Sequence, residues 1–362
     1  MKKTIAITSA LAAASSLATA EIKINEFLSF EGFVDMSYVH SDGELDGDGE
    51  TDNSFGVDQV EIDWLFNFGK VTAQVDLEYE GDNGRGDAND SDGGVEVEQA
   101  FVSYDLGNGA SITAGRYESM LGLEAKEPTG LYQYSTAYSL DGEFGLPGSS
   151  SVSILPDYAQ GVKYTRESNG TFFGISIQDQ SFDTDSGRFG GDGNDDNDSS
   201  YGIEVAFSTE LSDGLTFFLG GAYEDVENNA GDDTDTWVIN SYVTYETGAW
   251  TFGAELNYGE SDANGPAEAI TQFGLTGEET TQGLIMANYA YSDCCSVTGR
   301  ISYSEHDADG GVEADFTKYT LAHNYAVSDN LAIITEVSLV DGELAGDDAE
   351  ATTGAVEVLF TF

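Results

Sequence analysis

The side chains of this chain that could do chemistry are overwhelmingly carboxylates. Its 362 residues include 67 Asp and Glu against 12 Lys and Arg, and the formal net charge is −55 at pH 7. Such an excess of acid excludes nucleic acid as a partner, because binding to phosphates requires basic patches. What this number of carboxylates favours is the attraction and concentration of cations.

Two tracts alternate acidic residues with glycine and could hold a calcium ion. Alternating carboxylates and glycines can wrap a hard cation, but neither tract has the full spacing or the final glutamate of an EF-hand. A solvated loop that is merely screened by Ca²⁺ is the favoured interpretation over a defined site, and no other cofactor is predicted. The candidate ligands are Asp42, Glu44, Asp46 and Asp48 in the first tract and Asp183 and Asp185 in the second.

Catalytic chemistry finds little support in the remaining reactive residues. The sequence pattern places no serine or carboxylate partner beside His40, His306 or His323, so an enzyme is not predicted. Cys294 and Cys295 are adjacent, which excludes a disulfide framework. We expect free thiols there, or at most a vicinal disulfide at a turn.

Residues 1–20 have the pattern of an export signal. Lys2 and Lys3 precede an apolar run over residues 5–17, and Ala18-Thr19-Ala20 is a cleavage motif. The apolar run is shorter than the roughly 20 residues that a membrane-spanning helix needs. We therefore predict a signal peptide over residues 1–20 and a single domain over residues 21–362.

After residue 27 the chain alternates apolar and polar residues, which indicates β-strands. About sixteen such segments of roughly ten residues can be counted, joined alternately by short turns and by long acidic loops. Asn169-Gly170 is one of the strongest turn signals.

The polar face of these strands carries many ionisable residues, which cannot fill a dry core. We therefore predict an all-β protein, a transmembrane antiparallel β-barrel of about 16 strands, with its apolar face in lipid and a water-filled lumen. A large soluble β-repeat protein is the alternative, but no repeated blade motif is found.

Local sequences resemble those of a known family. The chain ends in alternating apolar residues and Phe362, which resembles the assembly signal of bacterial outer-membrane barrels. Gly115-Arg116 at the end of the fifth strand, Glu143-Phe144-Gly145, and Gly161 to Tyr164 resemble elements of Gram-negative outer-membrane porins of the 16-stranded diffusion type. Residues 122–139 are more similar to a less-studied group of β-barrel porins.

The resemblance implies a location and partners. The expected location is the outer membrane of a Gram-negative bacterium, in contact with lipid and lipopolysaccharide and with long extracellular loops. The expected partners are the barrel-assembly machinery, through the C-terminal strand, and two further copies in a homotrimer.

Residues 118–158 are too long for an ordinary connection and hold three of the four prolines. By resemblance they fold into the lumen after strand five and form a constriction, with Arg116 and Lys163 on a basic wall and Glu143 on the acidic loop that faces it. The constriction candidates are Arg116, Glu118, Glu124, Glu127, Tyr132, Tyr134, Asp141, Glu143, Lys163, Arg300 and Lys318.

The expected function is passive diffusion of ions and small hydrophilic solutes, with weak cation selectivity. An anion-specific pore would require rings of lysine and arginine, which this composition lacks. Two alternatives stay open. Tyr132, Tyr134 and Tyr138 could stack on sugars in a saccharide-specific channel, although packing of the loop against the barrel wall is the favoured explanation for them. A structural or adhesive barrel without transport is the other alternative.

Overall fold

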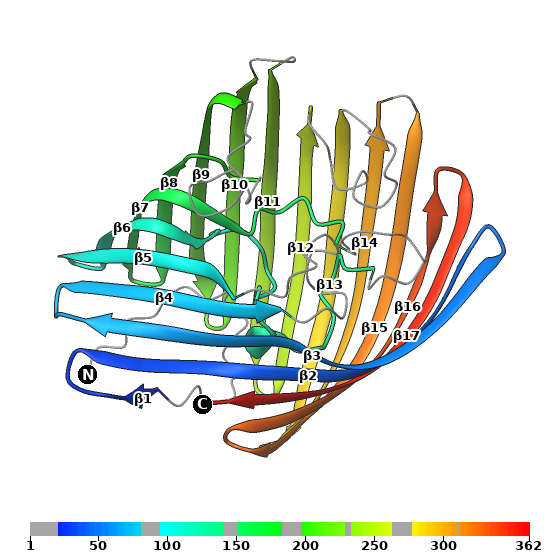
Figure 1. The fold of residues 1–362 in the computed structure, drawn as a ribbon, viewed down its shortest axis with the longest axis horizontal. Coiled ribbons are helices and arrows are strands. Elements are labelled where there is room, and N and C mark those ends of the chain that lie inside the picture. Colours follow the sequence, from blue (N-terminus) through cyan, green and yellow to red (C-terminus); the bar gives the residue numbers. More distant parts are fainter. Residues whose placement is uncertain are drawn as a thin grey trace.

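Sixteen antiparallel strands, β2 to β17, form a closed ring in the computed structural model, which describes residues 21–80, 95–140, 151–182, 197–228, 233–262, 277–309 and 311–362. Each strand pairs with the next one in the chain, and β17 pairs with β2 to close the ring. Figure 1 shows the resulting barrel, with the C-terminus beside the start of β2. The predicted all-β barrel is confirmed.

The strands are joined in simple up-and-down order, and a short strand β1 (Ile22–Lys23) pairs with β2 outside the ring. The barrel strands are β2 (Leu28–Leu45), β3 (Asp48–Asn67), β4 (Val71–Glu80), β5 (Glu96–Gly107), β6 (Ala110–Glu118), β7 (Tyr158–Ser168), β8 (Thr171–Gln178), β9 (Asn197–Ser212), β10 (Leu215–Asn228), β11 (Thr234–Thr247), β12 (Trp250–Ser261), β13 (Glu278–Ser292), β14 (Cys295–Ala308), β15 (Val312–Ser328), β16 (Leu331–Leu344) and β17 (Asp347–Thr361).

Helical structure is minimal in the described residues. A single 3₁₀ turn, η1 (Pro128–Gly130), lies between β6 and β7. None of the described helical structure has the length and apolar character needed to span a bilayer.

Polar residues face inward and apolar residues face outward, the reverse of a soluble barrel. In β12, Leu256 is 69% exposed, whereas its neighbours Glu255 and Asn257 are 3% and 1% exposed. In β15, Leu321 is exposed and Lys318 is buried. This reversal matches a barrel whose outer surface contacts hydrocarbon.

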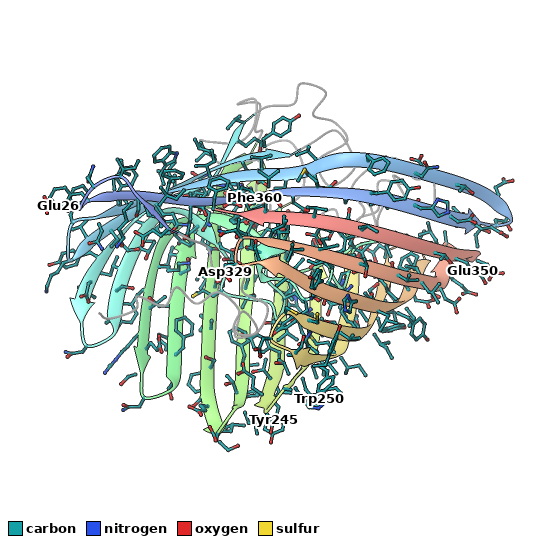
Figure 2. The ribbon with its side chains drawn as sticks, turned by 90° about the horizontal axis from the view of Figure 1, so that it is seen from below. Glu26, Tyr245, Trp250, Asp329, Glu350 and Phe360 are labelled. Carbon is teal, nitrogen blue, oxygen red and sulfur yellow. The ribbon has the colours of Figure 1, made fainter. Side chains whose placement is uncertain are left out.

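Aromatic side chains gather at the short-turn end of the outer surface. Figure 2 shows Tyr245 and Trp250 on either side of the β11–β12 turn, at the tips of these strands. The Trp250 ring stacks on Tyr289 with 4.4 Å between centroids. The amphipathic side chains of Tyr and Trp prefer the membrane interface, so these aromatic residues mark one edge of the lipid-facing band.

The C-terminal phenylalanine closes the seam of the barrel. The N–H of Phe362 donates to the carbonyl oxygen of Gly32 (2.9 Å), and the N–H of Gly32 donates back to Phe362 (3.0 Å). The Phe362 ring also packs edge-on against Phe30. The last residue therefore pairs with the first barrel strand and leaves no free edge there.

The prediction that the first acidic tract, residues 41–53, forms a long loop is wrong. These residues extend β2 and β3, which reach 18 and 20 residues instead of the expected ten or so. Asp46 and Gly47 form the turn with positive φ values of 51° and 82°, as a tight hairpin requires. Of the calcium candidates, Asp42 and Glu44 therefore lie on β2, Asp46 in the turn and Asp48 on β3, while Asp183 and Asp185 lie outside the described residues.

We predict that Gly32→Ala destabilises the closed barrel. A Cβ at Gly32 would lie 2.3 Å from the carbonyl oxygen of Glu61 and 3.0 Å from the Phe362 ring, so the backbone at the seam must shift. Overpacking of this kind costs about 1–3 kcal/mol. The temperature at which the folded band is lost in heat-shift electrophoresis should fall. Gly354→Ala is the matched control, since nothing lies within 4 Å of its Cβ; equal behaviour of the two variants would contradict the prediction.

Candidate functional site

The connection between β6 and β7 enters the barrel and binds its inner wall. We call it the inner loop, residues 119–157, of which residues 119–140 and 151–157 are described. Main-chain N–H groups near its start donate to inward-facing side chains of β9, β11 and β12. Met120 donates to Glu204 on β9 (2.6 Å), and Leu123 donates to Glu255 on β12 (2.7 Å). The predicted inward-folding loop after the fifth barrel strand is confirmed.

Apolar packing holds the inner loop against the wall from β8 to β17. Leu121, Leu123 and Ile154 of the loop belong to one buried cluster with wall residues that include Phe218 and Met286. The interface between the inner loop and this side of the wall is therefore partly apolar. Ordering a long loop costs conformational entropy, and burial of its apolar side chains offsets that cost.

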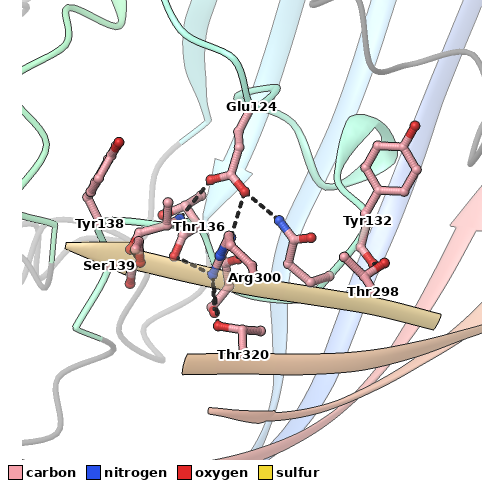
Figure 3. A network of polar contacts seen from close by, with 12 residues as sticks. Glu124, Tyr132, Thr136, Tyr138, Ser139, Thr298, Arg300 and Thr320 are labelled. Atoms are coloured by element: carbon pink, nitrogen blue, oxygen red, sulfur yellow. Dashed lines mark hydrogen bonds and ion pairs between the residues drawn. The ribbon is translucent and has the colours of Figure 1, made fainter. Parts of the chain in front are cut away.

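An ion pair between Glu124 and Arg300 lies at the centre of the inner loop (Figure 3). Arg300 Nη1 donates to Glu124 Oε1 at 2.6 Å. The same guanidinium donates to the carbonyl oxygens of Ser135 and Thr136, both at 2.9 Å, and to Thr320 Oγ1 at 3.2 Å. The Arg300 side chain is fully buried. One strand residue therefore holds two separate parts of the loop together.

Glu336 and Lys318 anchor the following part of the loop. Ser135 donates through its N–H (3.1 Å) and its hydroxyl (2.6 Å) to the Glu336 carboxylate on β16. Lys318 Nζ donates to the carbonyl oxygen of Ser139 at 2.7 Å. Arg300 and Lys318, both predicted as constriction residues, thus bind the loop backbone, which satisfies polar groups that would otherwise be buried without partners.

Arg116 and Lys163, expected on a basic wall, lie at the base of the inner loop. Arg116 Nε donates to the main-chain oxygen of Glu98 at 2.8 Å. Lys163 Nζ donates to the main-chain oxygen of Glu118 at 3.1 Å and lies 4.3 Å from the centroid of the Tyr117 ring. Asp141 and Glu143, expected to face this wall, are outside the described residues.

The tyrosines of the loop are packing residues in this structure. Tyr132, Tyr134 and Tyr138 are all buried. The carbonyl oxygen of Tyr132 accepts hydrogen bonds from Thr298 (3.1 Å) and Asn324 (2.7 Å), while the Tyr138 hydroxyl donates to Glu255 at 3.1 Å. Burial raises the pKa of Tyr132 to about 12, because it disfavours the phenolate. Their ring faces are used within the loop–wall interface.

Glu127 reaches the opposite wall, formed by β3 to β5 and β7. Its Oε2 accepts from Gln59 Nε2 at 2.9 Å, and its Oε1 accepts from the Tyr158 hydroxyl at 3.0 Å. Burial raises the pKa of the Glu127 carboxyl to about 7. The inner loop therefore crosses between two sides of the barrel.

Four further carboxylates lie near Glu127 and were not among the site residues predicted from the sequence. Glu61 and Asp63 on β3, Asp76 on β4 and Glu98 on β5 form two groups that share Glu61. A signal was present, because Glu61, Asp63 and Asp76 have inward parity on neighbouring strands. Their proximity depends on strand register, which pairs Asp63 directly with Asp76.

A cavity of about 460 Å³ lies beneath the inner loop at the short-turn end. Its lining includes Pro128, Thr129 and Leu131 from the loop and Ser292 and Ser328 from two of the turns. The tip of the loop with η1 therefore faces a vestibule at this end of the barrel.

We predict that Glu124→Gln releases the inner loop. Removing one partner of a buried ion pair leaves the other charge uncompensated and typically costs about 3–5 kcal/mol. Chymotrypsin should then cleave faster after Tyr132, Tyr134 and Tyr138, which are buried in the intact protein. Glu44→Gln, on the exposed part of β2, is the control and should leave cleavage unchanged. Equal cleavage rates for the two variants would show that the ion pair does not hold the loop.

Comparisons with known proteins agree with this geometry. Among solved structures, the chain is similar to the outer-membrane channel DcaP of Acinetobacter baumannii (TM-score 0.65, 12% identity, 92% of this chain and 97% of that one). It is also similar to OmpF of Salmonella typhi (0.62, 16%, 94% and 100%) and to the anion-selective porin of Comamonas acidovorans (0.59, 17%, 92% and 99%).

No functionally curated protein matches the sequence. Residues 28–362 match the family model described as "Putative beta-barrel porin-2, OmpL-like". The match covers nearly the whole chain, and the fold is that of outer-membrane porins. The protein therefore belongs to this family of outer-membrane β-barrel porins.

Proposed function

We propose that the protein is a passive diffusion channel for ions and small hydrophilic solutes, with weak selectivity for cations. The observation that carries this proposal is the inner loop, which is anchored to both sides of the barrel by Glu124, Glu127, Arg300 and Glu336. A loop fixed across a lumen narrows the passage. A channel built this way selects solutes by size and charge.

The charges inside the barrel support selectivity for cations. Buried inward carboxylates include Asp35, Glu204, Glu255 and Glu357. Arg300 and Lys318 donate to loop carbonyl oxygens, and Glu204 and Glu255 accept from loop N–H groups, so charges of both signs are partly used by the loop. The excess of acidic over basic residues in the chain still favours a negative lumen. The net field in the lumen is then negative and concentrates cations. Salt screens this field over about 8–10 Å, so the selectivity should be modest.

The burial of the loop tyrosines argues against a saccharide-specific channel. Stacking on a sugar ring requires an accessible aromatic face, and the faces of Tyr132 and Tyr134 are buried against the wall. Membership of this porin family gives no support to an enzymatic role. The three histidines of this chain suggest no catalytic site.

A homotrimer and contacts with the cell envelope complete the proposal. One solved form of OmpT from Vibrio cholerae, a similar barrel, is described as a trimer. Assembly through the C-terminal strand is supported by the seam that Phe362 forms with Gly32. Lipopolysaccharide would contact the outer rim, and native mass measurement would report the number of chains.

We predict a cation-selective reversal potential for refolded protein in a planar bilayer under a KCl gradient. The negative field of the lumen should favour K⁺ over Cl⁻, and the preference should weaken as total salt rises. Single-channel recording at two ionic strengths measures both effects. A reversal potential that favours Cl⁻ would sink the claim of cation selectivity.

We also predict that deleting residues 129–139 increases single-channel conductance. The deletion removes the part of the loop bound by Arg300 and Glu336, which should widen the open cross-section. The variant Tyr134→Phe removes the hydroxyl contact to Ser37 but leaves the loop in place, and should conduct like the wild type. Heat-shift electrophoresis checks that each barrel is folded. Unchanged conductance of a folded deletion variant would show that the loop does not limit the passage.

A further inference from the structure

Carboxylates cluster where the inner loop meets the wall of β3 to β5. One carboxylate oxygen each from Glu61, Glu98 and Glu127 lies within 4.8 Å of the others, and the same holds for Glu61, Asp63 and Asp76. Four of these residues are on strands, and Glu127 is on the inner loop. The cluster therefore joins two segments that are far apart in the sequence.

Several of these oxygens are buried and lack a hydrogen-bond donor. Glu61 is 3% exposed and Asp76 is fully buried. Within the described part of the chain, Glu61 Oε2, Asp63 Oδ1, Asp76 Oδ1 and Glu98 Oε2 have no hydrogen-bond partner. Buried polar atoms are normally satisfied, so unsatisfied oxygens on residues that cluster in one place indicate a missing positive or donating group.

No basic side chain supplies that group among the residues described. The ion pairs found there involve other carboxylates, such as Glu124 with Arg300 and Asp157 with Lys126. Arg116, nearby, donates its Nε–H to the main-chain oxygen of Glu98. Several buried carboxylates without a counter-charge are costly, because each loses its hydration and repels the others.

We propose that Glu61, Glu98 and Glu127 bind a Ca²⁺ ion at this junction, beside the second group that Glu61 forms with Asp63 and Asp76. Ca²⁺–oxygen distances of about 2.4 Å allow ligand oxygens on one ion to lie up to about 4.8 Å apart, which fits the observed spacing. Mg²⁺ requires shorter distances and near-octahedral geometry. Zn²⁺ prefers nitrogen and sulfur ligands, and this cluster offers only oxygen.

The ion would fasten the inner loop to the wall. Glu127 is the one loop ligand of the cluster, and Gln59 on β3 and Tyr158 at the start of β7 donate to its carboxylate. The Glu124–Arg300 pair holds the loop to the opposite wall, so the ion would provide the second attachment. Since the ligands come from both segments, binding of Ca²⁺ would favour the inserted position of the loop.

Calorimetric titration of Ca²⁺ into refolded, lipopolysaccharide-free protein tests the proposal. One site should bind much more tightly than the exposed acidic residues. Loss of a residue that only orients a ligand already costs 10–100-fold in affinity, so Glu127→Gln and Glu61→Gln should each weaken binding by at least about tenfold. Glu44→Gln, an exposed acid on β2, is the matched control and should leave the tight site unchanged.

Two results would overturn the proposal. One is tight binding that is the same in the wild type, Glu127→Gln and Glu61→Gln. The other is the absence of any tight site in folded wild type. If a variant fails to fold by heat-shift electrophoresis, anomalous diffraction from wild-type crystals grown with Ca²⁺ decides the question. A peak between Glu61, Glu98 and Glu127 supports the site, and peaks only elsewhere refute it. Ion binding is measured without conduction, so the outcome is independent of the proposed channel function.

Discussion

Backbone N–H and C=O groups inside a bilayer have no water to bind, and this constraint governs the whole architecture. A sheet can satisfy them only by closing on itself. Sixteen strands pair in sequence, and β17 returns to β2. The mutual hydrogen bonds of Gly32 and Phe362 continue this pairing to the last residue. Closure also determines which face of the sheet is polar. The outer face contacts lipid and must be apolar, so the polar side chains point into the lumen.

Charged residues on the inner wall then need partners of their own. The inner loop supplies many of them, because its backbone N–H and C=O groups bind Glu204, Glu255, Arg300 and Lys318. The loop is in turn held in the lumen by these same contacts and by the apolar cluster beside them. Wall and loop are therefore complementary: neither would bury its polar groups favourably without the other.

The two sides of the loop differ in how they are held. Toward β14, the carboxylate of Glu124 meets the guanidinium of Arg300, and hydrogen bonds complete the site. Toward β3, Glu127 meets other carboxylates, and their repulsion is unrelieved by any basic side chain in the described residues. A loop with one compensated and one uncompensated attachment is well suited to respond to a cation at the second.

The sequence by itself determined the class of the fold, because inward and outward parity, the turns and the terminal Phe362 are local patterns. It also identified the long connection and placed it after the fifth barrel strand. Local pattern failed at residues 41–53, where acid and glycine content suggested a loop. In these residues, strand pairing of β2 with β17 and with β3 outweighs the local preference for a loop, and Asp46-Gly47 forms the turn.

Only the tertiary structure decided which charges meet. Arg300 pairs with Glu124 across 176 positions of sequence, and Glu127 meets Glu61 and Glu98 through the path of the loop. Strand parity shows that such residues point inward, but it does not tell how far along the barrel axis each lies or where the loop crosses. Strand register and the packing of Leu121 and Leu123 on the wall set those positions. These are long-range properties, which is why the site had to be found in the folded protein.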